Sequence, residues 1–210
     1  MRGRFITLEG GEGAGKTTLI KALAAWLESQ GREVVLTREP GGTPGAESLR
    51  EILLTGATDR WSPMTEALLM YAARVDHVER LIEPALERGA WVISDRFADS
   101  TLAYQGAGGG IDTDRIRALH KAALGDFGPD LTLILDLDPK VGIERTIQRG
   151  EDSTRFERFD GGFHAKLRQC FLDIAAREPE RCLVLDAAAR PDEVRSRAID
   201  GIESRLGVSA

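Results

Sequence analysis

Short apolar runs alternate with longer amphipathic stretches along the whole chain. Most of the short runs are apolar at consecutive positions and are bounded by Gly, Pro or charged residues, a pattern typical of strands covered on both faces. The pattern therefore predicts five parallel strands, at Phe5–Glu9, Val34–Thr37, Trp91–Ser94, Leu131–Asp136 and Cys182–Leu185.

Between these runs, apolar residues recur at the three- to four-residue spacing of amphipathic helices. Ser62 and Pro63 are residue types preferred at a helix cap and first turn, and Pro84 should kink or end the helix that follows. The other expected helices are Thr17–Gln30, Asp112–Leu124, Pro139–Gln148, Gly162–Arg177 and Pro191–Leu206. This alternation predicts an α/β fold, with residues 1–210 forming one doubly wound five-stranded parallel sheet that carries helices on both faces.

Three segments interrupt the alternation, at Arg38–Ser48, Asp95–Ile111 and Arg149–Gly162. We expect loops there, and each follows the carboxyl end of a strand or lies over that edge of the sheet. Ligands bind along this edge in open α/β sheets. The third segment is polar, with glycine and arginine, and is expected to form a short lid over about residues 149–161.

Composition narrows the class of protein. The chain is 42% hydrophobic and 30% charged, which is typical of globular proteins, and its net charge of −6 provides no general attraction to nucleic acid or anionic lipid. Cys170 and Cys182 lack the spacing of a zinc site or a disulfide scaffold. No apolar run reaches the ~18 residues of a membrane span and no targeting segment is recognisable, so we expect a cytoplasmic protein.

The segment Gly10–Thr17 reads Gly-Gly-Glu-Gly-Ala-Gly-Lys-Thr and fits the phosphate-binding pattern GxxxxGK[ST]. It lies directly after the first expected strand and before the first helix, as that pattern requires. Its glycines let backbone N–H groups converge on a phosphate at the helix N-terminus. Because Lys16 can reach the β- and γ-phosphates and Thr17 can ligate Mg²⁺, the segment predicts a nucleoside triphosphate site.

Two features indicate which reaction this site serves. The chain contains no asparagine, which excludes the Asn-Lys-x-Asp motif of guanine-specific GTPases. Transfer to a hydroxyl calls for a catalytic Asp, whereas an acceptor phosphate is largely dianionic at pH 7 and needs cations instead. Arginines are frequent in and around the loops above the sheet: Arg38, Arg50, Arg74, Arg96, Arg145, Arg149, Arg155 and Arg158. The residues therefore favour a small P-loop kinase with a phosphate as acceptor.

The order of several motifs resembles that of bacterial thymidylate kinases. The motifs are Glu9–Thr18, Thr37–Thr43, Tyr71–Arg74, Asp95–Phe97, Ser100–Gly106 and Pro129–Asp136, and the resemblance covers nearly the whole chain. It implies that ATP and Mg²⁺ convert dTMP to dTDP in a nucleoside monophosphate kinase fold. It also implies a homodimer that acts on small-molecule substrates. The net charge and the lack of a long apolar run separately disfavour nucleic acid and a membrane as partners.

The resemblance implies roles for individual residues in binding. The ATP residues would be Gly10, Gly11, Glu12, Gly13, Ala14, Gly15, Lys16, Thr17 and Thr18, with Arg145 stacking on adenine. The dTMP residues would be Glu12, Arg38, Arg50, Met70, Arg74, Arg96, Thr101, Tyr104 and Gln105. Within this set, Arg38 and Arg96 would hold the phosphate, while Arg74 and Gln105 would read the thymine edge. Met70 departs from the family pattern, because many relatives carry Phe there for stacking on the base.

The same resemblance implies a catalytic set of Lys16, Arg96, Glu12, Arg149 and Arg155. Gly13 stands where some thymidylate kinases carry an arginine, so the catalytic arginine is expected from the lid, with Arg149 and Arg155 favoured over Arg158. Mg²⁺ would be held near Thr17, Asp95 and Glu12. Two alternatives remain open: another P-loop nucleotide or nucleoside kinase, and a non-enzymatic ATP-binding regulatory module.

Overall fold

The computed structural model describes residues 2–148, 155 and 159–207. Its strands form one parallel sheet in the order β2-β3-β1-β4-β5. They are β1 (Phe5–Gly10), β2 (Val34–Arg38), β3 (Trp91–Asp95), β4 (Leu131–Asp136) and β5 (Cys182–Asp186). The predicted five-stranded parallel sheet is confirmed, since each strand begins at the predicted residue and ends within one residue of the predicted end.

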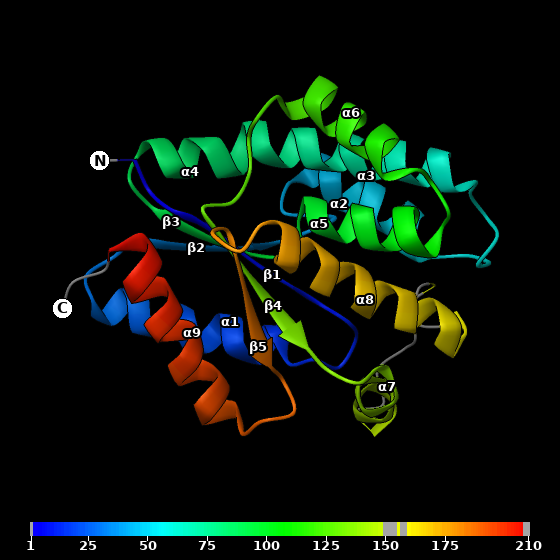
Figure 1. Ribbon diagram of the computed structural model, residues 1–210. Helices are drawn as coiled ribbons and strands as arrows, with labels where there is room; N and C mark the ends of the chain where they lie inside the picture. Colours follow the sequence, from blue (N-terminus) through cyan, green and yellow to red (C-terminus); the bar gives the residue numbers. More distant parts are fainter. Residues whose placement is uncertain (1, 149–154, 156–158, 208–210) are drawn as a thin grey trace.

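Helices cover both faces of this sheet (Figure 1). On one face, α1 (Lys16–Ser29) and α9 (Pro191–Leu206) pack on a core that includes Ile6, Leu8 and Leu133. The other face is covered by α3 (Pro63–His77), α4 (Glu83–Glu87) and α8 (Gly161–Arg177). Alternate residues of β1 face opposite layers, because Phe5 packs with α4 while Ile6 packs with α1.

Two of the predicted loops contain helices. The segment Arg38–Ser48 includes the start of α2 (Pro44–Leu54), where the Thr43 hydroxyl accepts from the backbone N–H of Ala46 at 3.2 Å and caps the helix. The segment Asp95–Ile111 includes α5 (Ala98–Thr101) and the π-helical turn η2 (Leu102–Gly108). Its small residues lack helical periodicity, so tertiary packing against α8 rather than local sequence stabilises it.

The prediction at Pro84 was also wrong in part. The helical path continues from α3 through the π-helical turn η1 (Val78–Ile82) into α4, and Pro84 lies in the first turn of α4. Pro84 has no N–H to donate to the preceding turn, and the change from α-helical to π-helical pairing lies directly before α4. The remaining helices are α6 (Thr113–Leu124) and α7 (Pro139–Gln148), and within the described ranges none of the helices combines the length and the apolar run needed to cross a membrane.

The backbone of helix α7 lies in close contact with the backbone of the glycine-rich segment that follows β1. A Cβ added at Gly142 would lie 2.2 Å from the carbonyl oxygen of Glu12, and one added at Gly13 would lie 2.1 Å from the carbonyl oxygen of Gly142. Neither contact can be relieved by a side-chain rotation, because both partners are backbone atoms. The two glycines therefore allow α7 to support the phosphate loop directly.

Substituting Gly142 with alanine is expected to destabilise the protein, although alanine normally favours a helix over glycine. The overlap with Glu12 should cost about 1–3 kcal/mol, the usual penalty for overpacking, and lower the melting temperature by several degrees. The matched control is Gly161→Ala, where the added Cβ meets no atom within 4 Å. A thermal unfolding experiment in which both variants gain stability would contradict the close packing of α7 on the loop.

Candidate active site

A cavity of about 440 Å³ opens at the carboxyl edge of the sheet, between the phosphate loop and the ends of β2 and β3. Helices α2, α3 and α5 and the turn η2 complete its walls. Every residue predicted to bind dTMP lines it: Glu12, Arg38, Arg50, Met70, Arg74, Arg96, Thr101, Tyr104 and Gln105. Side chains from four separate parts of the sequence therefore meet in one place.

The phosphate loop has the backbone geometry that its glycines permit. Gly10, Gly13 and Gly15 adopt positive φ angles of 133°, 67° and 92°. Lys16 is buried, and its Nζ donates to the carbonyl oxygens of Gly10 at 3.2 Å and Gly11 at 2.9 Å. Burial and the neighbouring Arg96 lower the pKa of Lys16. The ammonium group is thus held within the loop, next to the N-terminus of α1.

Arg96 links β3 to the phosphate loop. Its guanidinium donates to the carbonyl oxygen of Gly10 at 3.0 Å and to Glu12 Oε1 at 2.8 Å, and it lies over the Tyr104 ring with 5.0 Å from Cζ to the ring centroid. Arg96 has a φ of 73°, and among the described residues no other non-glycine residue has a positive φ. Such backbone strain persists where surrounding contacts over-determine it, often at functional sites. The turn after β3 therefore directs the Arg96 guanidinium towards the phosphate loop.

Among the described residues, Glu12 is one of three carboxylates that line this arginine-rich cavity, with Glu39 and Asp95. Burial opposes its ionisation, but Arg96 and then Lys16 outweigh burial and lower the pKa of Glu12 to about 2. The Tyr104 hydroxyl donates to Glu12 Oε1 at 2.9 Å. With a pKa of about 2, Glu12 is ionised at neutral pH. The stability that its lowered pKa contributes is lost only as the pH falls through that folded-state value.

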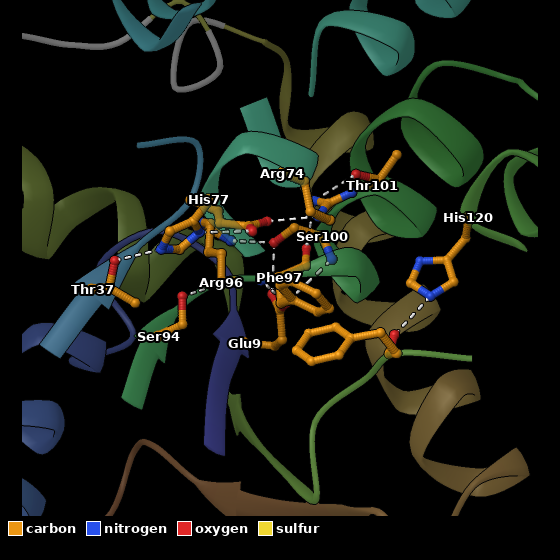
Figure 2. A network of polar contacts seen from close by, with 12 residues as sticks. Glu9, Thr37, Arg74, His77, Ser94, Arg96, Phe97, Ser100, Thr101 and His120 are labelled. Atoms are coloured by element: carbon orange, nitrogen blue, oxygen red, sulfur yellow. Dashed lines mark hydrogen bonds and ion pairs between the residues drawn. The ribbon is translucent and has the colours of Figure 1, made fainter. Parts of the chain in front are cut away.

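Glu9, at the end of β1, fixes the segment that carries Arg96. Glu9 Oε1 accepts from the backbone N–H of Phe97 at 2.8 Å, and Glu9 Oε2 accepts from the Ser100 hydroxyl at 2.6 Å (Figure 2). Burial, reinforced by the Asp99 carboxylate, raises the pKa of Glu9 to about 7. Sequence reasoning gave Glu9 no role, because its partners lie about ninety residues further along the chain.

Arg74 is held by a second buried carboxylate. Its Nε donates to Glu39 Oε2 at 2.7 Å, and its Nη2 donates to the carbonyl oxygen of Phe97 and to Thr101 Oγ1, both at 3.1 Å. Glu39 also contacts His77 Nδ1 at 3.1 Å, and His77 Nε2 contacts Thr37 Oγ1 at 2.6 Å; Figure 2 labels Arg74, His77 and Thr37. Arg74 lines the cavity, and its Nη1 is a buried donor that has no hydrogen-bond partner among the described residues.

The remaining predicted residues line the cavity in different environments. Arg38 is half-exposed and pairs with Glu47 at 3.1 Å, rather than with the adjacent Glu39. Arg50 donates to the Pro40 carbonyl oxygen at 2.7 Å, and burial is the main cause that lowers the pKa of Arg50. Met70 is partly buried and packs beside the cluster that contains Tyr104. Arg38 and Arg50 thus bring two further cations to the mouth of the site.

A second cavity of about 590 Å³ lies on the other side of the phosphate loop. Gly13, Ala14, Gly15 and Thr18 line both cavities. Arg145 lines the second one, as predicted for an adenine contact, and donates to the carbonyl oxygen of Ala187 at 3.3 Å. Sequence reasoning missed the residues that follow β5, namely Ala187, Ala189, Pro191, Asp192 and Arg195, although their place after a parallel strand could have indicated them.

The residues predicted to hold Mg²⁺ line the first cavity. The oxygens of Glu12, Thr17 and Asp95 are hard ligands of the kind that Mg²⁺ prefers. Within the part of the chain that the structure describes, no three His, Cys, Asp or Glu side chains form a metal-binding group. The donors fit a Mg²⁺ ion that takes most of its ligands from phosphate and water, as in other kinase sites.

The lid prediction falls mostly outside the described residues, since Arg149 and Arg158 are not among them. Arg155 is described and is 1% exposed. It donates to the carbonyl oxygens of Leu53 at 3.2 Å and Thr58 at 2.9 Å, and it pairs with Glu66 of α3. In this conformation Arg155 lies against α2 and α3, behind the cavity wall.

A phosphate loop with a cavity on each side, one of them lined by Arg38, Arg50, Arg74 and Arg96, is the arrangement of a P-loop nucleotide kinase. Comparison with known proteins gives the particular family. The thymidylate kinase family model matches residues 8–198. The chain is 56% identical to the thymidylate kinase of Caulobacter vibrioides, over 99% of both chains, and 49% identical to that of Rhizorhabdus wittichii, over 98% of this chain and 100% of the other.

A solved structure supports the same assignment. The crystal structure of thymidylate kinase from Ehrlichia chaffeensis matches with a TM-score of 0.77 and 35% identity, covering 96% of this chain and 99% of the other. The chain therefore belongs to the thymidylate kinase family. The predicted family and the predicted fold class are both confirmed.

Substituting Lys16 with methionine is expected to lower turnover by at least about a hundredfold, because a preorganised cation would be lost from the transferring phosphoryl group. The fold should remain, since the site lowers the pKa of Lys16 and methionine removes a buried charge. The control is Lys166→Met on the exposed surface of α8. ADP release and thermal unfolding are measured on both variants; a folded Lys16→Met protein with full activity would refute the assignment.

Proposed function

We propose that this chain transfers the γ-phosphoryl group of ATP, as its Mg²⁺ complex, directly and in line to the phosphate of dTMP, giving dTDP and ADP. The observation that carries the proposal is the position of Arg96. One guanidinium contacts the phosphate loop and lines the acceptor cavity, so it can hold an acceptor phosphate against the donor site. No covalent enzyme intermediate is needed.

Charge is the main requirement of such a reaction. The donor and acceptor phosphates repel each other, and they react only if cations hold them in line. In our proposal Lys16 and the lid residue Arg149 stabilise the transferring group, while Arg38, Arg50 and Arg96 bind the acceptor. Arg155 is buried against Glu66 and lies outside the cavity lining, so we assign it no contact with the transferring group. Glu12 would accept from the sugar 3′-hydroxyl. Mg²⁺, when bound near Thr17 and Asp95, would neutralise charge on the ATP phosphates.

Domain organisation, cellular location and oligomeric state are also part of the proposed function. We propose one domain over residues 1–210, a cytoplasmic enzyme and a homodimer. Ile52 of α2 and Leu68 of α3 are large apolar side chains with exposed fractions of 38% and 51%, on helices that pack against each other. Apolar side chains exposed on adjacent helices are compatible with a surface that a second copy covers.

An acceptor series with ATP tests the proposed function. We expect ADP release to depend on added acceptor and to be fastest with dTMP. dUMP lacks one methyl group and should be about 10–200-fold less efficient, because one apolar group in a fitted pocket contributes about 1–3 kcal/mol. A coupled assay with dTMP, dUMP, dCMP and dGMP, and with no acceptor as control, measures this order.

The other outcomes decide between the alternatives. Preference for a different monophosphate or for an unphosphorylated nucleoside would identify another P-loop kinase. ATP binding without acceptor-dependent ADP release would favour a regulatory module that acts through a partner.

A further inference from the structure

Glu66 is a buried carboxylate to which the sequence analysis assigned no role. It lies behind Gln105, one of the two residues predicted to hydrogen-bond the thymine base. Glu66, in α3, is 7% exposed. Its Oε1 accepts from Gln105 Nε2 at 2.7 Å, and its Oε2 pairs with the guanidinium of Arg155. Gln105 lines the cavity and Glu66 does not, so Glu66 contacts the cavity wall from its protein side.

The chemistry of this contact fixes the direction of the Gln105 amide. A carboxylate that is paired with a guanidinium has only acceptor oxygens, so the group that faces it must be a donor. The amide nitrogen of Gln105 therefore faces Glu66, and the amide oxygen is the group that remains for a ligand. Turning the amide over would place its oxygen against the carboxylate and leave buried groups unpaired.

Arg74 supplies a donor of equally fixed direction beside this acceptor. Glu39 and Thr101 accept from two of its nitrogens, Nη1 is buried with no hydrogen-bond partner within the described ranges, and the residue lines the cavity. An arginine cannot exchange its donor for an acceptor. The cavity wall thus carries one residue that can only donate and one amide whose oxygen is left to accept. Each is held by a carboxylate: Arg74 by Glu39, which also lines the cavity, and Gln105 by Glu66, which does not.

We propose that Glu66, anchored by Arg155, is a positioning residue that sets pyrimidine specificity by locking the Gln105 amide with its oxygen towards the base. This inference rests on the proposed function. A base with an N3–H donor next to a 4-carbonyl acceptor, as in thymine and uracil, complements the locked pair. A 4-aminopyrimidine such as cytosine has an acceptor at N3 and a donor at position 4, so both groups are mismatched.

The proposal explains how dCMP is rejected without a steric block. Sites that hydrogen-bond a substrate reject an analogue with mismatched groups by up to about 10⁴–10⁵-fold, because buried polar groups are left unpaired. That rejection requires that the protein cannot rearrange to suit the wrong base. Glu66 supplies this rigidity at Gln105, as Glu39 does at Arg74.

Glu66→Gln tests the lock with little change of shape. A glutamine can donate as well as accept, so Gln105 becomes free to turn its nitrogen towards the base. We expect kcat/KM for dCMP relative to dTMP to rise at least tenfold, with dCMP still the poorer substrate because Arg74 is unchanged. The ratio cancels any loss in the phosphoryl-transfer step that both substrates share, and dUMP separates the contribution of the methyl group.

Asp99→Asn is the matched control. Asp99 is also 7% exposed and is paired with an arginine, Arg181, at 2.8 Å, but it lies outside the first cavity. The control should lose similar stability and keep the dCMP-to-dTMP ratio. A folded Glu66→Gln enzyme with an unchanged ratio would overturn the proposal, and so would an equal rise in both variants.

A second measurement on the unaltered protein keeps the inference testable if Glu66→Gln does not fold. The chain has four glutamines and no asparagine, so its side-chain amide NMR spectrum should contain four NH₂ pairs. Gln105→Ala assigns the pair of interest. We expect those protons to exchange slowly with solvent; exchange as fast as that of the exposed Gln30 would overturn the lock. If the unaltered enzyme instead failed to phosphorylate dTMP, the proposed function itself would be wrong.

Discussion

The contact between Arg96 and the phosphate loop is the interaction on which the site depends. Arg96 follows β3 directly, and β3 pairs with β1, so the sheet register places this residue beside the loop that follows β1. A positive φ then turns the side chain across the sheet edge, and Glu9 holds the next residues in place through Phe97 and Ser100. The sheet and Glu9 thereby fix the Arg96 guanidinium in place before any substrate binds, as electrostatic preorganisation requires.

Carboxylates that contact the binding groups give the site its rigidity. Glu12 contacts Arg96, Glu39 contacts Arg74, and Glu66 contacts both Gln105 and Arg155. Breaking a buried pair by removing one partner is costly, so each carboxylate restrains the group that it touches. These acids also reduce the repulsion between arginines before any anionic substrate is bound. Each of these binding groups thus has a carboxylate partner that restrains it.

The strands and the phosphate loop could be predicted from the sequence, because the residue patterns that indicate them are local. The strands followed from apolar runs, and the phosphate loop followed from glycine and lysine spacing between a strand and a helix. The supports behind the site could not be predicted, because Glu39 and Glu66 lie 35 and 39 residues from Arg74 and Gln105, and no local pattern encodes such pairs. The turn η2 was missed for a related reason, since it is stabilised by packing against α8, and α5 packs on η2 and β1. Arg38 likewise pairs with Glu47 and not with its neighbour Glu39.

The most direct test is a crystal structure of the protein with dTMP and a non-hydrolysable ATP analogue. We expect the dTMP phosphate within hydrogen-bond distance of the Arg96 guanidinium and in line with the terminal phosphate of the analogue. The ATP phosphates should lie in the loop beside Lys16. A dTMP phosphate bound away from Arg96, or out of line with the triphosphate, would contradict the claim that this arginine joins the two sites.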